Sequence, residues 1–398
     1  MLLPLLLACT PADPSPTDTS PDTAPACTGD IPPTPLQRDP TNPALTAGLT
    51  VDGLTDYTIA DPDLSWDEAT GAWSLYYMAA RGTSIADDLR MVIRHATSAD
   101  GLAWVLSEEA VFAAAEDRGA WDHTHSETPS VASRPDGDPD RRYVLVYSGA
   151  NGDPEGLGFA NYGIGAATSA DGTHFERIPA EESPTGQAGQ VLTWRDVYPD
   201  SEAGVVADPE LGFADGRWHL WFSSFACSDG CTRVDAYGVA HAVSDDAVHW
   251  TADAQSPLPA LLRDPDSPTT GGAQPSVAWD ERSCTWSMWL SADEPGATDT
   301  QPVVFNNASA FYRATSDDGQ AWTVDFDTPA LGWDPEAPGE DLGLLTGADG
   351  AFHDGLPRLA YVGFSAEDTP AGFYLPVQPW YDAAGYAAGW TVLNGAGE

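Results

Sequence analysis

Apolar positions in this chain fall in short runs separated by polar turns, and long helical patterns are missing. From about residue 45 onward, runs such as 73–80 (WSLYYMAA), 143–150 (YVLVYSGA) and 218–225 (WHLWFSSF) are rich in aromatic and β-branched residues and are bounded by Gly and Asp turns. Such runs predict β-strands. The few candidate helical stretches, such as 108–117 (EEAVFAAAED), fit loops between strands better than a helical layer.

One nine-residue turn occurs four times, at 96–104 (ATSADGLAW), 167–175 (ATSADGTHF), 242–250 (AVSDDAVHW) and 314–322 (ATSDDGQAW). Its serines are 71, 75 and 72 residues apart. A fixed period indicates stacked repeat units. Asp and Gly favour a chain reversal, and we expect the final aromatic residue to pack between units. The turn is therefore predicted to be structural and not a binding site.

Each repeat predicts four strands. The first begins just after Pro62, Pro129, Pro209 or Pro275, the second is rich in aromatic residues, the third leads into the repeated turn, and the fourth follows it. A degenerate fifth unit follows at 344–366, with 389–395 (GWTVLNG) as its outer strand. The predicted fold is all-β, a five-bladed β-propeller of four-stranded blades over residues 45–398. A β-sandwich with coincidental spacing is the alternative.

Charge excludes some partners. The formal net charge is −45, from 61 acidic and 16 basic residues, and every basic residue is Arg. Nucleic acids and anionic membrane surfaces need a basic surface, so neither is expected to bind. The first explanation for the excess of acidic residues is solubility in a salty or calcium-bearing medium. The second is that clustered carboxylates bind Ca²⁺. We expect a monomer.

The N-terminal residues 1–9 (MLLPLLLAC) form an apolar run too short to span a bilayer. The stretch from Leu6 to Cys9 resembles the lipobox of bacterial lipoproteins. The resemblance implies a signal peptide at 1–8, lipidation of Cys9, and a protein held at the cell surface or in the periplasm by its lipid alone. An ordinary cleaved signal on a secreted protein is the alternative. Residues 9–44, rich in Pro, Thr and Asp, predict a disordered tether.

Cysteines fit an exported chain, because disulfides persist in oxidising compartments. Cys227 and Cys231 close a tight loop and are the predicted disulfide. A zinc site is the alternative, although one CxxxC without a second pair is weak evidence. Pairing of Cys27 with Cys284 is left open.

The inner strands of a propeller converge at its axis, so residues around the first-strand prolines should share one mouth. The residues before proline are Asp61, Thr128, Asp208 and Gln274, with Gly347 aligned in the fifth unit. Two residues further on lie Asp63, Ser130, Glu210, Ser276 and Asp349. Strand alternation points both members of each pair to one side. Glu127 is a further carboxylate, two residues before Pro129.

Clustered carboxylates are costly, since like charges repel and burial disfavours ionisation. Glycoside hydrolysis supplies a reason for them. One carboxyl must be protonated to donate to the leaving oxygen, and another must be ionised to activate water. Neighbouring carboxylates push their pKa values apart and so create these two roles.

The short turn S-x-D-G-x-x-W and the Asp61-Pro62 pair resemble the five-bladed propeller glycosidases of glycoside hydrolase families 43 and 62 and the related family 32. The resemblance implies that Asp61 is the base, a Glu is the acid and a further Asp tunes the acid, in an inverting reaction. In those families the acid lies in an E-G-P motif of the third blade. Here ETP at Glu127 lies in the second blade, and the third blade has Asp208-Pro209-Glu210. The acid is thus Glu127 or Glu210; our hypothesis is Asp61 as base, Glu127 as acid and Asp208 as supporting carboxylate.

Other residues complete the predicted site. Trp121 is the candidate sugar platform, and His123, His125, Asp63 and Gln274 are candidate substrate contacts. Metal binding is the alternative role for His123 and His125. His241 and Arg94 are expected to line the channel. No cofactor is required by acid–base chemistry, and Ca²⁺ in the central channel is left open.

The predicted activity is hydrolysis of plant or microbial polysaccharide outside the cell. The main alternative is a non-catalytic surface propeller that binds glycans or proteins, because one fold hosts many functions. A glycoside phosphorylase is a third option, but it needs a phosphate-binding cluster of Arg or Lys. With no Lys and few central Arg, the sequence supports that option poorly.

Overall fold

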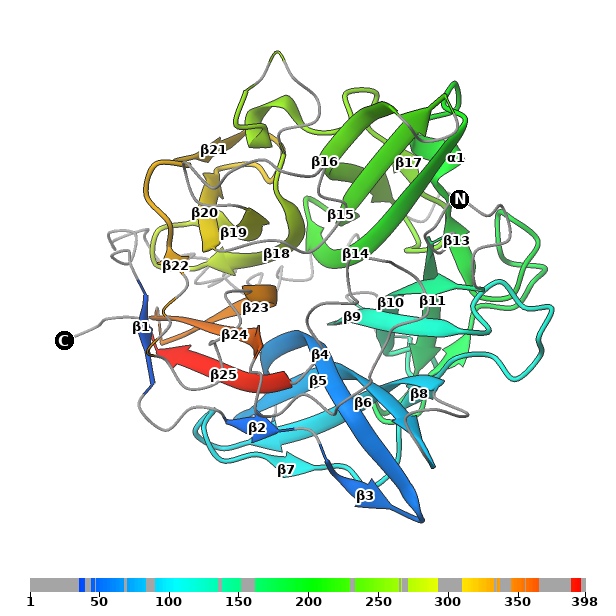
Figure 1. Ribbon diagram of the computed structural model, residues 1–398, viewed down its shortest axis with the longest axis vertical. Helices are drawn as coiled ribbons and strands as arrows, with labels where there is room; N and C mark the ends of the chain where they lie inside the picture. The colour runs from blue at the N-terminus through cyan, green and yellow to red at the C-terminus, as the bar shows by residue number, and fades with distance from the viewer. Residues whose placement is uncertain are drawn as a thin grey trace, which may run out of the picture.

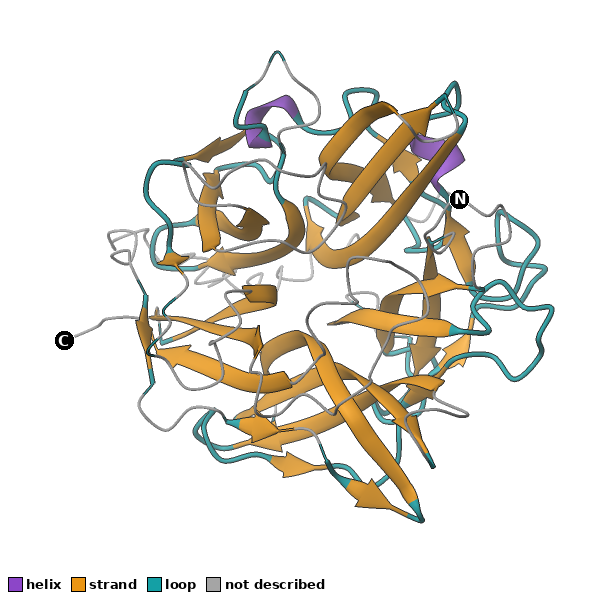
Figure 2. Cartoon of the chain, viewed as in Figure 1, coloured by secondary structure: helices purple, strands orange, loops and turns teal. Residues whose placement is uncertain are grey.

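The computed structural model describes residues 36–394 except 40–43, 47, 68–69, 84–89, 135–137, 152–161, 230–232, 265, 267–270, 293–309, 333, 335, 337–344, 355 and 365–387. The predicted signal peptide, Cys9, Cys27 and Cys231 lie outside the described residues. Figure 1 shows five sheets arranged radially around a central axis. The predicted five-bladed β-propeller is confirmed. Figure 2 shows how little helix there is; the described helices are α1 (Trp194–Val197) and the 3-10 turn Pro259–Leu261.

The first four blades have their strands in chain order from the axis outward. Blade one contains β4 (Leu54–Asp67), β5 (Ala72–Gly82), β6 (Arg90–Ser98) and β7 (Val105–Leu106), with β3 (Thr50–Val51) and β8 (Phe112–Ala113) added. Blade two contains β9 (His125–Ser133), β10 (Tyr143–Ala150), β11 (Gly163–Ser169) and β12 (Glu176–Arg177), with β13 (Gln190–Leu192) added. Blade three contains β14 (Ala203–Ala214), β15 (Arg217–Ser228), β16 (Arg233–Ser244) and β17 (Thr251–Ala252). Blade four contains β18 (Ala273–Asp280), β19 (Thr285–Ala292), β20 (Ala310–Ser316) and β21 (Trp322–Val324), with β22 (Leu331–Gly332) added.

Blade five closes the ring with strands from both ends of the described chain. It contains β23 (Leu345–His353), β24 (Leu356–Phe364) and β25 (Ala388–Asn394), and both β1 (Gln37–Arg38) and β2 (Leu45–Thr46) pair with β25. The prediction that 389–395 is the outer strand was wrong, because N-terminal strands cover the edge that β25 would otherwise leave unpaired. The propeller also begins earlier than residue 45, since β1 lies inside the predicted tether.

The repeated turn is held by its own Ser and Asp side chains. In the first copy the Ser98 hydroxyl accepts from the Gly101 N–H at 2.9 Å, and the Asp100 carboxylate accepts from the N–H groups of Leu102 and Ala103, both at 2.9 Å. The same bonds recur in the other three copies. These bonds lower the pKa of Asp100 to about 2. The structural interpretation of the turn is confirmed.

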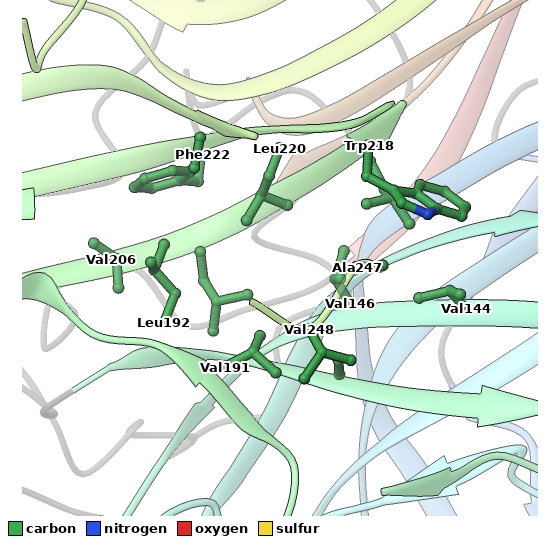
Figure 3. Close-up of a cluster of buried hydrophobic side chains, with 14 of the residues drawn as sticks. Val144, Val146, Val191, Leu192, Val206, Trp218, Leu220, Phe222, Ala247 and Val248 are labelled. Atoms are coloured by element: carbon green, nitrogen blue, oxygen red, sulfur yellow. The ribbon is translucent and has the colours of Figure 1, made fainter. Parts of the chain in front are cut away.

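The hydrophobic core is divided among the interfaces between blades. Figure 3 shows the cluster between blades two and three, where Val146 of β10 and Val206 of β14 are fully buried with Leu220 of β15. The aromatic residue of the repeated turn joins such interfaces. Trp322 packs its ring 6.1 Å from that of Trp221 in the preceding blade. Packing of every blade on its neighbours fixes the inner strands around the axis.

Two further features bear on the predictions from the N-terminus and the cysteines. Cys227 and Cys284 are both disulfide-bonded. Cys231, the predicted partner of Cys227, lies outside the described residues, so that pairing stays a prediction. Cys27 also lies outside them, and its pairing with Cys284 stays open. Within the described part of the chain, no helix has the length and apolar character needed to cross a membrane.

Candidate functional site

Each inner strand carries a bulge at the level of its proline, or of Ala348 in blade five, which has no proline there. In the first four blades the inner strands do not begin after the proline, as predicted, but start two to eight residues earlier and run through it. In blade one the pairing register shifts between Ala60 and Asp63, and the corresponding shifts occur in the other four blades. A bulge tolerates proline because it removes the residue from the hydrogen-bonded ladder. The prolines therefore mark bulges and not strand starts.

The residue before each proline has a left-handed backbone. The φ angles are 52° at Asp61, 49° at Thr128, 50° at Asp208 and 52° at Gln274, and Gly347 takes 55° in blade five. Outside glycine this conformation is strained, most of all for a β-branched residue such as Thr128. Its recurrence at one level of all five blades shows that the fold imposes it there.

The bulges surround a small cavity on the propeller axis. Its volume is about 30 Å³, room for about two water molecules. The lining comes from all five inner strands: Asp61, Pro62, Thr128, Pro129, Asp208, Pro209, Glu210, Gln274, Pro275, Gly347, Ala348 and Asp349. Asp208 and Glu210 both face the cavity, so the two side chains of this pair lie on one side of the strand, as predicted. A bulge, and not simple strand alternation, places them there.

The second residues of the five pairs form a closed ring of hydrogen bonds, the interblade ring. Each side chain accepts from a backbone N–H of the next inner strand: Asp63 from Val131 at 3.1 Å, Ser130 from Leu211 at 3.1 Å, Glu210 from Val277, Ser276 from Gly350 at 2.8 Å, and Asp349 from Leu64. The last bond joins blade five back to blade one. Asp63 and Glu210, predicted as site residues, therefore have structural partners between blades.

The interblade ring holds three carboxyl groups that cannot all ionise. Burial, and then the charge of Asp349, raises the pKa of Asp63 well above its usual range. Burial and the charges of Asp349 and Asp63 do the same for Glu210. Burial raises the pKa of Asp349 to about 7, although the Ser276 hydroxyl donates to it at 2.5 Å. The ring is thus partly protonated at neutral pH.

Asp61, Glu127 and Asp208, the mouth carboxylates, lie together and are partly exposed. Burial raises the pKa of Asp61 well above its usual range, and the charges of Glu127 and Asp208 add to the effect. Burial raises the pKa of Glu127 to about 7, against a hydrogen bond from Tyr162. Burial, with a smaller contribution from Glu127, raises the pKa of Asp208 to about 7. The three groups therefore share protons near neutral pH, and Asp61 has a larger upward shift of pKa than the other two.

Glu127 and Asp208 differ in their hydrogen-bond partners. The Tyr162 hydroxyl donates to Glu127 Oε1, and the Tyr162 ring lies 5.3 Å from that of His125. His125 is buried, which lowers its pKa to about 4, so it is neutral beside the carboxylates. Asp208 Oδ2 is buried and has no hydrogen-bond partner among the described residues. It is a carboxylate oxygen that a substrate hydroxyl or a proton can satisfy.

Gly347 makes room for Asp61. A Cβ placed on Gly347 would lie 3.1 Å from Asp61 Oδ1 and 3.3 Å from its Cα. Asp61 of the first blade thus occupies the space that a side chain at position 347 would need. Sequence alignment placed Gly347 at this level, but only the structure explains the glycine.

Several predicted site residues have other surroundings. Trp121 is not a sugar platform: only 8% of it is exposed, it stacks on Tyr147, and its indole N–H donates to the Ala188 carbonyl at 2.9 Å. Its large apolar ring is buried where the 107–124 segment packs on blade two. His123 Nδ1 lies 2.7 Å from the Ala115 carbonyl oxygen, which fixes the same segment.

The polar candidates Arg94, His241 and Gln274 also bond within the protein. Arg94 is fully buried and donates to the carbonyls of Ser107 and Glu108, so it does not line the channel. His241 is buried between His219 and Asp253, away from the axis. Gln274 does line the cavity, but its amide oxygen accepts from the Gly347 N–H at 3.1 Å.

No group of three or more His, Cys, Asp or Glu side chains is arranged to hold a metal in the part of the chain that the structure describes. His123 and His125 therefore belong to no such group among the described residues. Ca²⁺ in the channel stays a prediction that these observations do not test.

Comparison with known proteins identifies the architecture. No family model matches the chain, and no curated protein matches its sequence. Among solved structures, a glycoside hydrolase aligns at a TM-score of 0.55 with 14% identity, over 92% of this chain and 93% of that one. A thermostable family-43 glycoside hydrolase aligns at 0.53 with 12% identity, over 88% and 92%.

A third structure belongs to a family of mannoside phosphorylases that contains hydrolases acting on β-1,2-mannosidic linkages. It aligns at 0.53 with 13% identity, over 91% of this chain and 94% of that one. At these identities the similarity shows the fold alone. The chain has a glycoside hydrolase-like propeller fold, and neither its substrate nor its mechanism follows from the similarity.

Proposed function

We propose that this protein is an extracytoplasmic glycoside hydrolase whose mouth carboxylates perform acid–base catalysis. The observation that carries the proposal is the clustering of Asp61, Glu127 and Asp208 at one end of the axis, with raised pKa values. A hydrolase needs one protonated and one ionised carboxyl group near neutral pH. Strained bulges that recur in every blade hold two of the three groups there.

In the proposed reaction, Glu127 donates its proton to the glycosidic oxygen as the bond from that oxygen to the anomeric carbon breaks. For this step the proton shared by the cluster must lie on Glu127 and not on Asp61, which then takes a proton from a water molecule as the water oxygen bonds to the anomeric carbon. The axial cavity beside Asp61 has the size of water and not of a sugar ring. The sugar would thus lie above it, with the nucleophile below. Asp208 raises the pKa of Asp61.

Glu127 is a better acid candidate than Glu210. Glu210 accepts from the Val277 N–H and interacts with Asp63 and Asp349 in the interblade ring. Glu127 instead interacts with the other mouth carboxylates, and one of its oxygens is oriented by Tyr162. An acid must reach the leaving oxygen, and Glu127 is not held in the interblade ring.

Water is a better acceptor than phosphate. No Arg lines the axial cavity, and His125, whose ring lies 5.3 Å from that of Tyr162, is neutral. A phosphate dianion would therefore meet carboxylates without a compensating cation. This favours hydrolysis over phosphorolysis, although one structural neighbour belongs to a family of phosphorylases.

The experiment is a screen of arabinan, xylan and fructan oligosaccharides, and then of other neutral glycans, for reducing-end release. Wild-type protein should hydrolyse at least one, and D61N and E127Q should each lose at least a hundredfold in kcat/KM. D63N is the matched control, because Asp63 lies two residues from Asp61 but belongs to the interblade ring. Full activity of D61N and E127Q would refute the assignment. Glycan binding without hydrolysis would favour the non-catalytic alternative.

Two finer features belong to the same proposal. Inversion predicts that ¹H NMR of the first product shows the anomer opposite to the substrate. Lipid anchoring predicts that Cys9 incorporates labelled palmitate in a bacterial host and that C9S abolishes the label. Retention of configuration would contradict the inverting mechanism. A label that persists in C9S would contradict lipid anchoring at Cys9.

A further inference from the structure

We propose that Ser223 is a positioning residue of the mouth: it accepts the hydrogen bond from the Gln274 N–H and so keeps the Asp208 carboxylate out of the contacts between blades. This inference rests on the proposed function and adds to it a residue that acts through another. Ser223 is fully buried, so it does not touch the substrate itself.

Three second strands carry a serine at the level of the bulges. Ser148 of β10, Ser223 of β15 and Ser291 of β19 each lie opposite the residue that precedes the left-handed position of the inner strand. The corresponding residues of blades one and five are Met78 and Val362, which have no hydroxyl group. All three serines are buried, so each hydroxyl needs partners within the protein.

In blades two and three the serine accepts the backbone N–H of the next bulge. The Asp208 N–H donates to Ser148 Oγ at 2.8 Å, and the Gln274 N–H donates to Ser223 Oγ at 2.7 Å. Ser148 Oγ is also hydrogen-bonded to Thr128 Oγ1. The serines thus pair N–H groups that the bulges withdraw from the sheet ladders.

Blades four and one use the side chain at the left-handed position instead. Gln274 Oε1 accepts the Gly347 N–H at 3.1 Å, and Ser291 does not accept but donates to the same oxygen at 3.0 Å. In blade one the Asp61 carboxylate accepts from the Thr128 N–H, which opposes the rise of its pKa. In both blades the left-handed residue is the acceptor because no serine takes the N–H of the next blade.

Ser223 therefore releases Asp208 from the kind of bond that Gln274 makes. Asp208 has the same backbone position as Gln274, but Ser223 accepts the N–H of the next blade in its place and donates its own hydrogen to the Asp208 carboxylate. A hydroxyl has one hydrogen and two lone pairs, so both bonds form together. Asp208 Oδ2 is left buried and without a partner among the described residues.

The position of the Asp208 charge matters for the base. The charged groups that face Asp208 in the described part of the chain are Asp61 and Glu127, and the Asp208 charge raises the pKa of Asp61. Without Ser223, Asp208 should turn to the Gln274 N–H, because an unpaired buried N–H is costly. A carboxylate that accepts this N–H directly shares its charge with the donor. Asp61 would then ionise at a lower pH.

Crystal structures of S223A and S291A test the geometry without any substrate. In S223A an oxygen of Asp208 should lie within about 3.2 Å of the Gln274 nitrogen. S291A is the matched control, because Ser291 occupies the same position of the next blade but donates to Gln274 and not to Asp208. Asp208 should therefore stay in place in S291A. An unmoved Asp208 in S223A, with the Gln274 N–H unpaired or bonded to water, would overturn the inference.

The pH dependence of kcat/KM, on a glycoside that the wild type cleaves, tests the consequence. D208N should move the midpoint of the acidic limb, which reports ionisation of Asp61, to lower pH by about 1 pH unit or more. S223A should move it in the same direction, and S223A/D208N should match D208N, because no charge remains at position 208. S291A should match wild type. A wild-type midpoint in S223A would overturn the role of Ser223.

The outcomes separate this inference from the proposed function. If no glycan is cleaved, the proposed function fails, and the crystal structures still decide whether Ser223 releases Asp208. If a glycan is cleaved and S223A keeps the wild-type structure and pH profile, the hydrolase stands and the role of Ser223 falls. A moved Asp208 carboxylate in S223A, together with a midpoint shifted as in D208N, supports both.

Discussion

Asp349 in the interblade ring offers a sharp test of the structure through the pH dependence of stability. Its carboxylate accepts from the Leu64 N–H and from the Ser276 hydroxyl, and its pKa is about 7 against an ordinary value of 3.8. A pKa raised on folding means that the native state holds the proton more tightly than the unfolded chain. The contribution of Asp349 to stability is therefore fully present below about pH 4 and is lost as pH rises through the window from about 4 to 7.

The magnitude follows from the two pKa values. Three pH units of difference correspond to on the order of 4 kcal/mol of lost stability once pH exceeds 7, and to only about 0.5 kcal/mol at pH 4. D349N cannot ionise and so escapes this loss. The amide supplies one acceptor where the carboxyl group offers two, so one hydrogen bond is weakened, at a cost of about 1 kcal/mol. The variant should be about 3 kcal/mol more stable than wild type at pH 8 and slightly less stable at pH 4.

The assay is urea unfolding of both proteins at pH 4, 5.5, 7 and 8.5, followed by tryptophan fluorescence. The expected result is a crossover near pH 4.5 to 5 with an unchanged dependence on urea concentration. D349N less stable than wild type at pH 8.5, or a difference that does not vary with pH, would refute the account of the interblade ring.

Three further predictions follow from other contacts. D100N should destabilise the protein at neutral pH, and this effect should shrink as pH falls from about 4 to about 2, the opposite trend to D349N. The bonds to Leu102 and Ala103 hold the Asp100 pKa at about 2 against an ordinary value of 3.8, so stability from the ionised group is lost as pH falls through that window; thermal melts across pH test this. G347A should lower kcat/KM at least tenfold without changing charge, because its Cβ would meet Asp61 Oδ1 at 3.1 Å; unaltered kinetics would exclude the crowding. W121A should cost about 3–5 kcal/mol of stability, as a buried aromatic truncation does, yet leave the glycan affinity of the folded protein unchanged in calorimetry.

The sequence predicted the architecture because the fold repeats itself. Four copies of the turn at a nearly constant spacing indicate repeated units, and the turn's Ser and Asp are the residues that fold it locally. The first-strand prolines likewise located the level of the site. Both signals are local and periodic, which is the information that one sequence carries without an alignment.

Other features depend on contacts distant in sequence. The closure of blade five joins Gln37 to Asn394, and no local pattern announces that pairing. Strand alternation cannot reveal a bulge, so the division between mouth carboxylates and interblade ring was not predicted, and Asp63 and Glu210 were assigned to the site. Tyr162 was missed because a tyrosine before a strand has no distinguishing signal until it meets Glu127. Trp121 was wrongly predicted to contact sugar, because its position in a loop was taken to mean that its side chain is exposed.

The division of labour between Glu127 and Asp61 is tested most directly by leaving-group dependence. Once a cleaved sugar is known, kcat/KM is measured for wild type, E127Q and D61N on its methyl and 2,4-dinitrophenyl glycosides. The dinitrophenolate leaves without a proton, so E127Q should lose less than tenfold on that substrate and at least a thousandfold on the methyl glycoside. D61N should lose at least a hundredfold on both, because water must be activated in either case. Equal losses of E127Q on the two substrates would contradict its role as the acid.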